Sequence, residues 1–222
     1  MPDRNATTSL RIWDPWVRLV HWAIVVLFTL SVASGLAGHF RVHFLSGYAL
    51  LALVLFRLAW GFVGSETARF AAFLRGPKAV LRSLSGFLRR SPDATAGHNA
   101  AGGWSVVALL TLLLLQAGSG LFANDAIFTY GPLARRVPPD VSDLATSLHI
   151  RLWIVLAALV GLHVLAVLLY ALLRRTDLIG PMITGRKRLP AGTPEPAMAP
   201  GWLACVLLAA SAALVWGISR LG

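Results

Sequence analysis

Long apolar runs alternate with short polar and basic segments along the chain. Five runs stand out, at residues 18–38, 43–63, 103–123, 148–173 and 202–219. Each is close to the ~20 residues that a helix of ~1.5 Å rise per residue needs to cross the ~30 Å apolar core of a bilayer. Backbone groups in that core find no water to bond, so the runs must be helical. The pattern predicts an all-α integral membrane protein with five spans.

The segments between the runs differ in character. Residues 190–200 are rich in Pro and Ala, which is typical of a linker, and the run beyond them looks like an appendage. The first run follows 17 mixed residues and lacks an A-x-A end, so we expect no cleavable signal peptide. No repeat period is visible. We therefore expect a four-helix transmembrane bundle over residues 11–188, a linker over 189–200 and an additional C-terminal transmembrane helix over 201–222.

One loop has a helical pattern of its own. After Gly76-Pro77 the chain places several apolar side chains so that they share one helix face: Val80, Leu81, Leu84, Phe87 and Leu88. Lys78, Arg82 and Arg89 lie at the edges of this face. The pattern indicates a short helix lying on the anionic inner leaflet, and a solvated basic loop is the alternative.

Composition and charge support the membrane interpretation. The 222 residues are 57% hydrophobic and 13% charged, whereas soluble domains carry about 25% charged residues. A purely soluble fold is thus excluded. The single cysteine, Cys205, excludes an internal disulfide, a cysteine-rich zinc site and covalent attachment of haem.

The net charge is +11, and the basic residues are distributed unequally between the two sides of the predicted membrane. Three segments carry most of the basic residues: Arg4, Arg11 and Arg18, then Arg69, Arg75, Lys78, Arg82, Arg89 and Arg90, then Arg174, Arg175, Arg186, Lys187 and Arg188. The opposite side has only Arg41, Arg135, Arg136 and Arg220. The positive-inside rule predicts that the N-terminus is cytoplasmic and that the C-terminus lies outside. Because topology accounts for the charge, we expect membrane lipid and no nucleic acid as a partner.

The histidines carry the candidate chemistry. They are His21, His39, His43, His98, His149 and His163. The fourteen residues from His149 to His163 correspond to about 21 Å of rise and about 1400° of turn, so both side chains project from nearly one helix face. His43 matches the depth of His149, and His21 matches the depth of His163. Four histidines then form two pairs between helices, one near each membrane surface.

Two opposed imidazoles in an apolar bundle suit a bis-histidine haem. Glycines would give the flat ring room: Gly35, Gly47, Gly118, Gly120 and Gly161. Arg18 and Arg57 are candidates for the propionates of the inner haem, and Arg151 or Arg41 for those of the outer haem. The alternatives are interhelical hydrogen bonds for the histidines, close packing for the glycines and snorkelling for Arg57 and Arg151. A structural zinc site would need four ligands at one point, and these lie at two depths.

These residues resemble the prokaryotic cytochrome b561 family and, more distantly, the b-type cytochrome subunits of nickel–iron hydrogenases and formate dehydrogenases. The resemblance rests on Trp13-Asp-Pro-Trp-Val-Arg-Leu-Val-His21, His43-Phe-Leu-Ser-Gly47, Leu55-Phe-Arg57, Gly97-His-Asn-Ala-Ala-Gly-Gly-Trp104, Gly161-Leu-His163 and Met182-Ile-Thr-Gly-Arg-Lys187. It implies a four-helix bundle with two non-covalent b haems, held by His21 with His163 and by His43 with His149. His39, one turn before His43, is the competing ligand in the second span. The fifth span lies outside this core, and the sequence gives it no chemical role.

The predicted function is electron transfer between an outer-side partner and the membrane quinone pool, since a six-coordinate iron has no open site. The partner would be a c-type cytochrome, a hydrogenase subunit or a dehydrogenase subunit. It would dock on residues 124–147, which hold Asp125, Arg135, Arg136, Asp140 and Asp143. No residue is predicted to be catalytic, because the apolar runs hold no Asp or Glu and no G-x-S-x-G motif occurs.

Three points stay open at this stage. His98 and Asn99 could hydrogen-bond a quinone, or Asn99 could cap the third span while His98 is solvated. As an alternative function, the resemblance also implies a superoxide:quinone oxidoreductase. A haem-free membrane anchor or small transporter is the other alternative.

Overall fold

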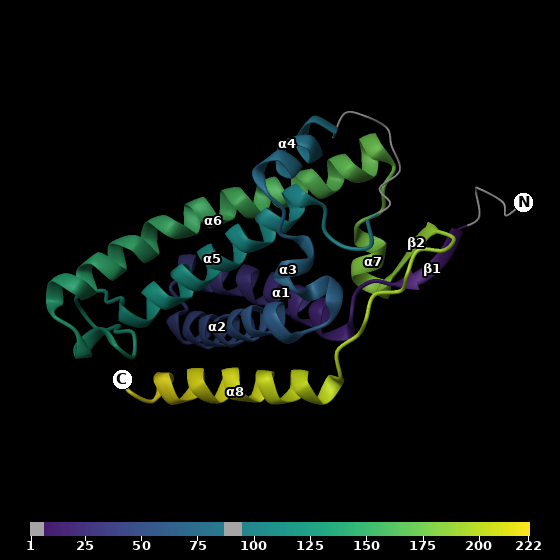
Figure 1. The fold of residues 1–222 in the computed structure, drawn as a ribbon. Coiled ribbons are helices and arrows are strands. Elements are labelled where there is room, and N and C mark those ends of the chain that lie inside the picture. Colours follow the sequence, from purple (N-terminus) through teal and green to yellow (C-terminus); the bar gives the residue numbers. More distant parts are fainter. Residues whose placement is uncertain (1–6, 87–94) are drawn as a thin grey trace, which may run out of the picture.

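The computed structural model describes residues 7–86 and 95–222. Its long elements are five helices: α1 (Pro15–Leu36), α2 (Phe40–Val63), α5 (Ala100–Phe122), α6 (Pro139–Arg174) and α8 (Gly201–Ser219). All five are long and apolar enough to cross a membrane, and they lie alongside one another (Figure 1). This confirms the prediction of an all-α membrane protein with five spans. With 36 residues, α6 is about 54 Å long and exceeds the thickness of the apolar core.

Local signals in the sequence set the helix boundaries. Asp14 precedes α1, and its side chain accepts the Val17 backbone N–H at 2.9 Å, while Pro15 occupies the first turn. Asn99 caps α5 in the same way by accepting the Gly102 N–H at 2.8 Å. Gly38, with φ of +73°, turns the chain from α1 directly into α2.

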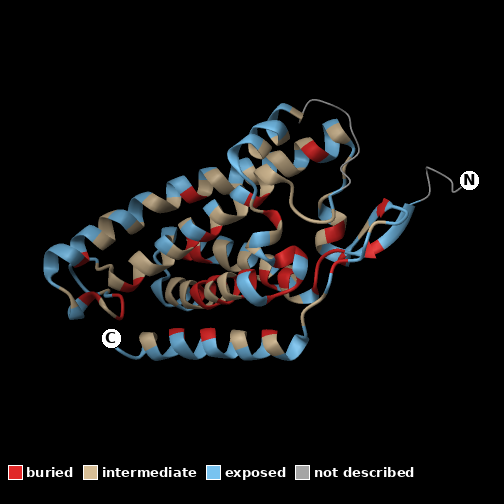
Figure 2. Ribbon diagram, in the orientation of Figure 1, coloured by how far each residue is buried: buried red, intermediate tan, exposed pale blue. Residues whose placement is uncertain are grey.

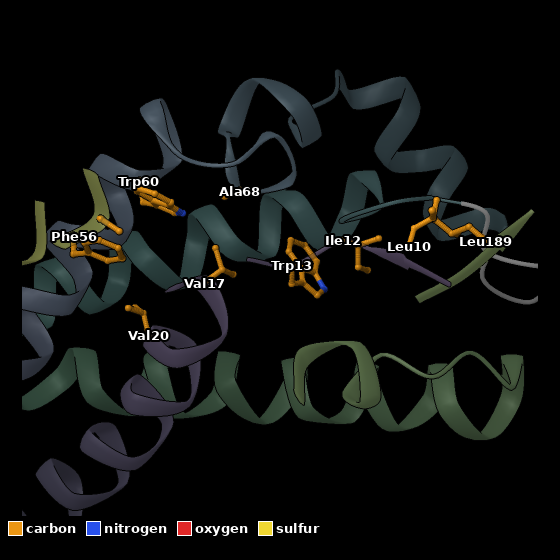
Figure 3. Packing of buried hydrophobic residues seen from close by; sticks show 10 residues of the cluster. Leu10, Ile12, Trp13, Val17, Val20, Phe56, Trp60, Ala68 and Leu189 are labelled. Atoms are coloured by element: carbon orange, nitrogen blue, oxygen red, sulfur yellow. The ribbon is translucent and has the colours of Figure 1, made fainter. Parts of the chain in front are cut away.

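α1 packs against α2 as one hairpin, and α5 packs against α6 as a second hairpin. α2 is the central helix of the bundle, because it also contacts α5 and α8. α2 carries the two largest fully buried side chains, Phe56 and Trp60. Figure 3 shows both in an apolar cluster with Trp13, Val17 and Val20 of the α1 region. Outward faces of α6 and α8 are largely exposed apolar surface, as expected for contact with lipid (Figure 2).

The two ends of the bundle differ. At one end, here called the ribbon end, β1 (Thr7–Arg11) pairs antiparallel with β2 (Arg186–Pro190), with Arg11 opposite Arg186. At the other end, the loop end, residues 123–138 connect α5 to α6. The remaining short elements are η1 (Glu66–Ala68), α3 (Phe70–Phe73), α4 (Pro77–Ser85), η3 (Ala134–Arg136) and α7 (Ile179–Thr184). The sequence did not predict the ribbon.

The helix expected after Gly76-Pro77 is present as α4. Its Leu81 and Leu84 are 66% and 59% exposed, so an apolar strip does face outward. The rest of that pattern, Phe87, Leu88 and Arg89, lies outside the described residues, as does Arg4. The location of α4 on a leaflet stays a prediction.

α8 is docked along the bundle instead of being a detached appendage. The backbone N–H groups of Ala197 and Ala199, in the segment before it, donate to Glu66 and Ser65 at 3.0 and 3.1 Å. At its far end, the Arg136 guanidinium donates to the Leu221 carbonyl at 2.9 and 3.1 Å. Polar contacts therefore hold both ends of this apolar helix to the core.

Candidate functional site

His43 and His149 meet toward the loop end. Their ring centroids lie 5.8 Å apart, and the ring planes stand at 85°. Two metal–nitrogen bonds of about 2 Å on opposite sides of one ion place the bonded nitrogens about 4 Å apart and the ring centres about 6 Å apart. The spacing between α2 and α6 thus suits one metal centre between these imidazoles.

The second nitrogen of each ring is already engaged. His43 Nδ1–H donates to the Ser31 carbonyl at 2.8 Å, and His149 Nδ1–H donates to the Gln116 carbonyl at 2.9 Å. A carbonyl only accepts, so the proton sits on Nδ1 and Nε2 carries the lone pair that a metal would bind. At His149 the Gln116 amide nitrogen lies 3.4 Å from Nε2 and is the group that a metal would displace. Histidine ligands in proteins usually donate the other ring N–H in this way.

His21 and His163 come together toward the ribbon end, on α1 and α6. His163 is among the groups that act electrostatically on His21. His21 Nδ1 is buried and, within the described residues, has no hydrogen-bond partner. The two histidines therefore lie near each other at this end, and their pairing as ligands stays a prediction.

His98 also lies at the ribbon end, just before α5. Its ring packs between Trp13 and Phe73, with centroid distances of 4.7 and 4.8 Å. Burial, followed by the charges of Arg57, His163 and His21, lowers the pKa of His98 to about 3. His98 is thus a neutral side chain held among aromatic rings. His98 is partly buried against these rings, whereas the alternative considered from the sequence had it solvated.

Buried cations accompany the ribbon-end pair. Arg57 is only 6% exposed, its guanidinium lies 5.7 Å from the Phe70 ring centroid, and its buried Nη1 lacks a hydrogen-bond partner among the described residues. Arg18 donates to the Ile183 carbonyl, while its buried Nε is likewise unpaired. Unsatisfied guanidinium N–H groups fit the propionates of a haem. The two arginines considered for the other end, Arg41 and Arg151, are exposed.

The glycines fall into two groups. A Cβ on Gly35 would lie 2.9 Å from His43 Nδ1, and one on Gly120 would lie 2.9 Å from His149 Cε1. These two glycines make room for imidazole rings, whereas the sequence suggested room for the porphyrin. A Cβ on Gly47, Gly118 or Gly161 would meet nothing within 4 Å, so space beside these backbones is open to a flat ring.

Two other predicted residues have different surroundings. Asn99 uses its oxygen for the α5 cap and its amide nitrogen to donate to the Tyr170 hydroxyl at 2.7 Å. Both polar atoms are engaged, which is the capping role weighed from the sequence. His39 is exposed and is the residue before α2, while His43, one turn on, faces His149.

The sequence missed the contribution of Ser31 and Gln116. The Gln116 amide donates to the His149 carbonyl at 3.0 Å, and its Oε1 is buried without a partner among the described residues. A lone glutamine in an apolar run was the available signal. The described residues hold no group of three or more His, Cys, Asp and Glu side chains able to hold a metal, so the donors come as pairs of imidazoles.

Comparison with known proteins gives one match. The family model of prokaryotic cytochrome b561 matches residues 12–185, which includes all four paired histidines. No curated protein and no solved structure matches the chain. The chain therefore belongs to the prokaryotic cytochrome b561 family of membrane-embedded b-type cytochromes, which bind haem b and transfer electrons across a membrane.

Proposed function

We propose that the chain holds two haem b groups at different depths, one between His43 and His149 and one between His21 and His163. The observation that carries the proposal is the 5.8 Å pair with both Nδ1 atoms bonded to carbonyls. Haem supplies one-electron chemistry when bound. If two imidazoles held each haem, no coordination site would be open to oxygen, which would favour electron transfer.

The spacing of the two pairs supports transfer across the membrane. Along α6, fourteen residues separate His149 from His163, which is about 21 Å of the ~30 Å core. Arg57 and Arg18 supply N–H groups for propionates at the ribbon end. The exposed Arg151 or Arg41 would serve the loop end.

We further propose that the ribbon end is cytoplasmic and the loop end periplasmic, in a bacterial inner membrane. Within the described residues, the basic segments, including β2 and α4, gather at the ribbon end. A c-type cytochrome, or a hydrogenase or dehydrogenase subunit, would then dock at the loop end. Exposed charged residues there are Asp125, Arg135, Arg136, Asp140 and Asp143.

Electrons would be exchanged with the quinone pool at the ribbon end. His98 is the better quinone candidate of the two considered, because Nδ1 is buried and unpaired among the described residues. Both polar atoms of Asn99 already have a hydrogen-bond partner. No observation favours the superoxide:quinone reaction over this role.

Haem counting on purified protein tests the proposal. A pyridine haemochrome assay should give two haems per chain. His43→Ala and His163→Ala should each lose one haem and retain the other. The matched control, His39→Ala, should retain both, since His39 is exposed. One haem in the wild-type protein, or loss of neither haem in both variants, would refute the two-haem arrangement, and a colourless protein would instead favour an anchor.

A further inference from the structure

The two loop-end histidines are held in the same way by different hairpins. His43 on α2 donates from Nδ1 to the carbonyl of Ser31 on α1, and its ring lies against Gly35. His149 on α6 donates from Nδ1 to the carbonyl of Gln116 on α5, and its ring lies against Gly120. In both hairpins the accepting carbonyl and the glycine are four residues apart, which is one helical turn.

A serine completes each arrangement. Ser119 Oγ donates to the Gln116 carbonyl at 3.0 Å. Ser34 Oγ donates to the Leu30 carbonyl at 2.7 Å and lies 3.2 Å from the Ser31 carbonyl oxygen, so it is only a weak second donor there. The two segments, Ser31-Val-Ala-Ser-Gly-Leu36 and Gln116-Ala-Gly-Ser-Gly-Leu121, share Ser-Gly-Leu in register. We call each segment a histidine cradle. The contacts assign one task to both cradles, which is to receive an imidazole from the next helix.

Helix geometry explains the residue types. Inside a helix the carbonyl of residue i accepts the N–H of residue i+4, and its second lone pair is free for another donor. An imidazole can reach that lone pair only if the residue at i+4 does not obstruct it. Glycine at i+4 provides this access, since a Cβ there would lie 2.9 Å from an imidazole atom in either cradle.

At the ribbon end, His21 lacks this support. His21 Nδ1 is buried without a partner among the described residues. Donation from Nδ1–H makes Nε2 a stronger electron donor, which stabilises the ferric form of a bound iron and lowers its reduction potential. The buried charge of Arg57 acts in the opposite sense at the ribbon end, because a nearby cation favours the reduced, less positive centre.

We propose that Ser31 with Gly35, and Gln116 with Gly120, are positioning residues that orient both ligands of the loop-end haem and hold its reduction potential below that of the ribbon-end haem. This inference rests on the proposed two-haem function. It adds that the two histidine cradles, 85 residues apart in the sequence, act on the same haem.

Redox titration of the purified protein, followed by haem absorbance, tests the inference. Gly35→Ala and Gly120→Ala should each raise the lower of the two midpoint potentials and leave the upper one unchanged. We expect a change of at least tenfold in the electron distribution, which is about 59 mV for a one-electron couple. The low-spin ferric EPR signal of the same haem should move as the ring turns. Gly217→Ala in α8 is the matched control, since a Cβ there meets nothing within 4 Å.

Milder variants keep the test decisive if an alanine prevents haem loading. Ser119→Ala removes the competing donor to the Gln116 carbonyl, so this carbonyl accepts the His149 N–H more strongly. This variant should therefore decrease the midpoint potential of the lower-potential haem, opposite in sign to the glycine variants. Ser34→Ala should change that potential less, because the Ser34 hydroxyl donates mainly to the Leu30 carbonyl. The inference would be overturned if the cradle variants shifted the potentials of different haems or shifted the upper midpoint potential. It would also be overturned if their midpoint potentials equalled those of Gly217→Ala. Two haems with unmoved potentials would refute the cradles alone, whereas a wild-type protein without two haems would refute the proposed function.

Discussion

Removing the Asp14 carboxylate should destabilise the junction between α1 and α2. Asp14 is 2% exposed, and each of its oxygens has its own partner. Oδ1 accepts the Val17 N–H at 2.9 Å and caps α1, while Oδ2 accepts the indole N–H of the fully buried Trp60 at 3.1 Å. Loss of a cap costs about 0.5–2 kcal/mol, and a buried donor left unpaired costs about 1–3 kcal/mol. Asp14→Ala should therefore lower the free energy of unfolding by about 2–4 kcal/mol.

A second substitution separates the two bonds. In Asp14→Asn the amide oxygen can still cap α1, but the NH₂ group then faces the indole N–H, so donor meets donor. We expect a loss of about 1–3 kcal/mol from the indole bond alone. Asp14→Asn and Trp60→Phe both break this bond, so the double variant should lose less than the sum of the single losses.

The assay is denaturant unfolding in detergent micelles, followed by circular dichroism on haem-loaded protein. Thr29→Ala serves as the control, because the exposed Thr29 hydroxyl bonds only within its own helix. A value for Asp14→Ala within about 0.5 kcal/mol of wild type would contradict the reasoning, since exposed sites commonly vary by that much. Additive losses for Asp14→Asn and Trp60→Phe would show that the indole bond contributes nothing measurable.

Three further predictions concern the loops and helix ends. Hydrogen bonds from the backbone N–H groups of Thr129, Ile127 and Phe128 lower the pKa of the Asp125 carboxyl to about 2. The backbone amides of residues 127–129 should therefore stay protected from hydrogen exchange at pH 4 and lose this protection as the pH falls through about 2. Asp125→Ala should lose the protection already at neutral pH. Unchanged hydrogen exchange in this variant would contradict the prediction. Asn99→Ala should lower the free energy of unfolding by about 1–2 kcal/mol through loss of the α5 cap. Asn99→Asp should stay closer to wild type, because its carboxylate can still cap α5. Equal stabilities of the two variants in thermal unfolding would exclude the cap. Arg136→Ala should speed hydrogen exchange in the last turn of α8 and leave the haem spectrum unchanged, and unaltered exchange there would show that the bond to Leu221 is dispensable.

The hydropathy pattern was sufficient to predict the spans, because a bilayer imposes length and apolarity on every crossing segment. The fourteen-residue spacing of His149 and His163 likewise predicted two levels, since helical rise fixes depth and helical twist fixes the face. Both predictions depend on geometry within one helix. Contacts between distant segments were not accessible in this way.

The missed features depend on backbone groups or on long-range pairing. Ser31 and Gln116 act through their carbonyls, which every residue has, so their side chains do not reveal this role, and the lone glutamine in an apolar run only marked Gln116 as unusual. The β1–β2 ribbon joins residues 7–11 to 186–190, and its polar strands show no hydrophobic alternation that predicts pairing. The partner of Asn99, Tyr170, lies 71 residues away.

The relation between the two hairpins was hidden from a search for repeats by their unequal connections. Residues 37–39 join α1 to α2, whereas residues 123–138 join α5 to α6. No single period can align Ser31 with Gln116 and His43 with His149 at once. The correspondence appears only when each histidine is followed to the carbonyl it contacts.

The buried charge of Arg57 bears on how the ribbon end is completed. Desolvating a guanidinium is costly unless its N–H groups are paired. Asp14 is the acidic group that acts on Arg57, but both Asp14 oxygens are already used by Val17 and Trp60. Phe70 offers a ring face without an acceptor for Nη1. A propionate would supply both the missing acceptor and the missing negative charge at Arg57. Haem binding and folding should therefore be coupled more strongly at the ribbon end than at the loop end, where the candidate arginines are exposed.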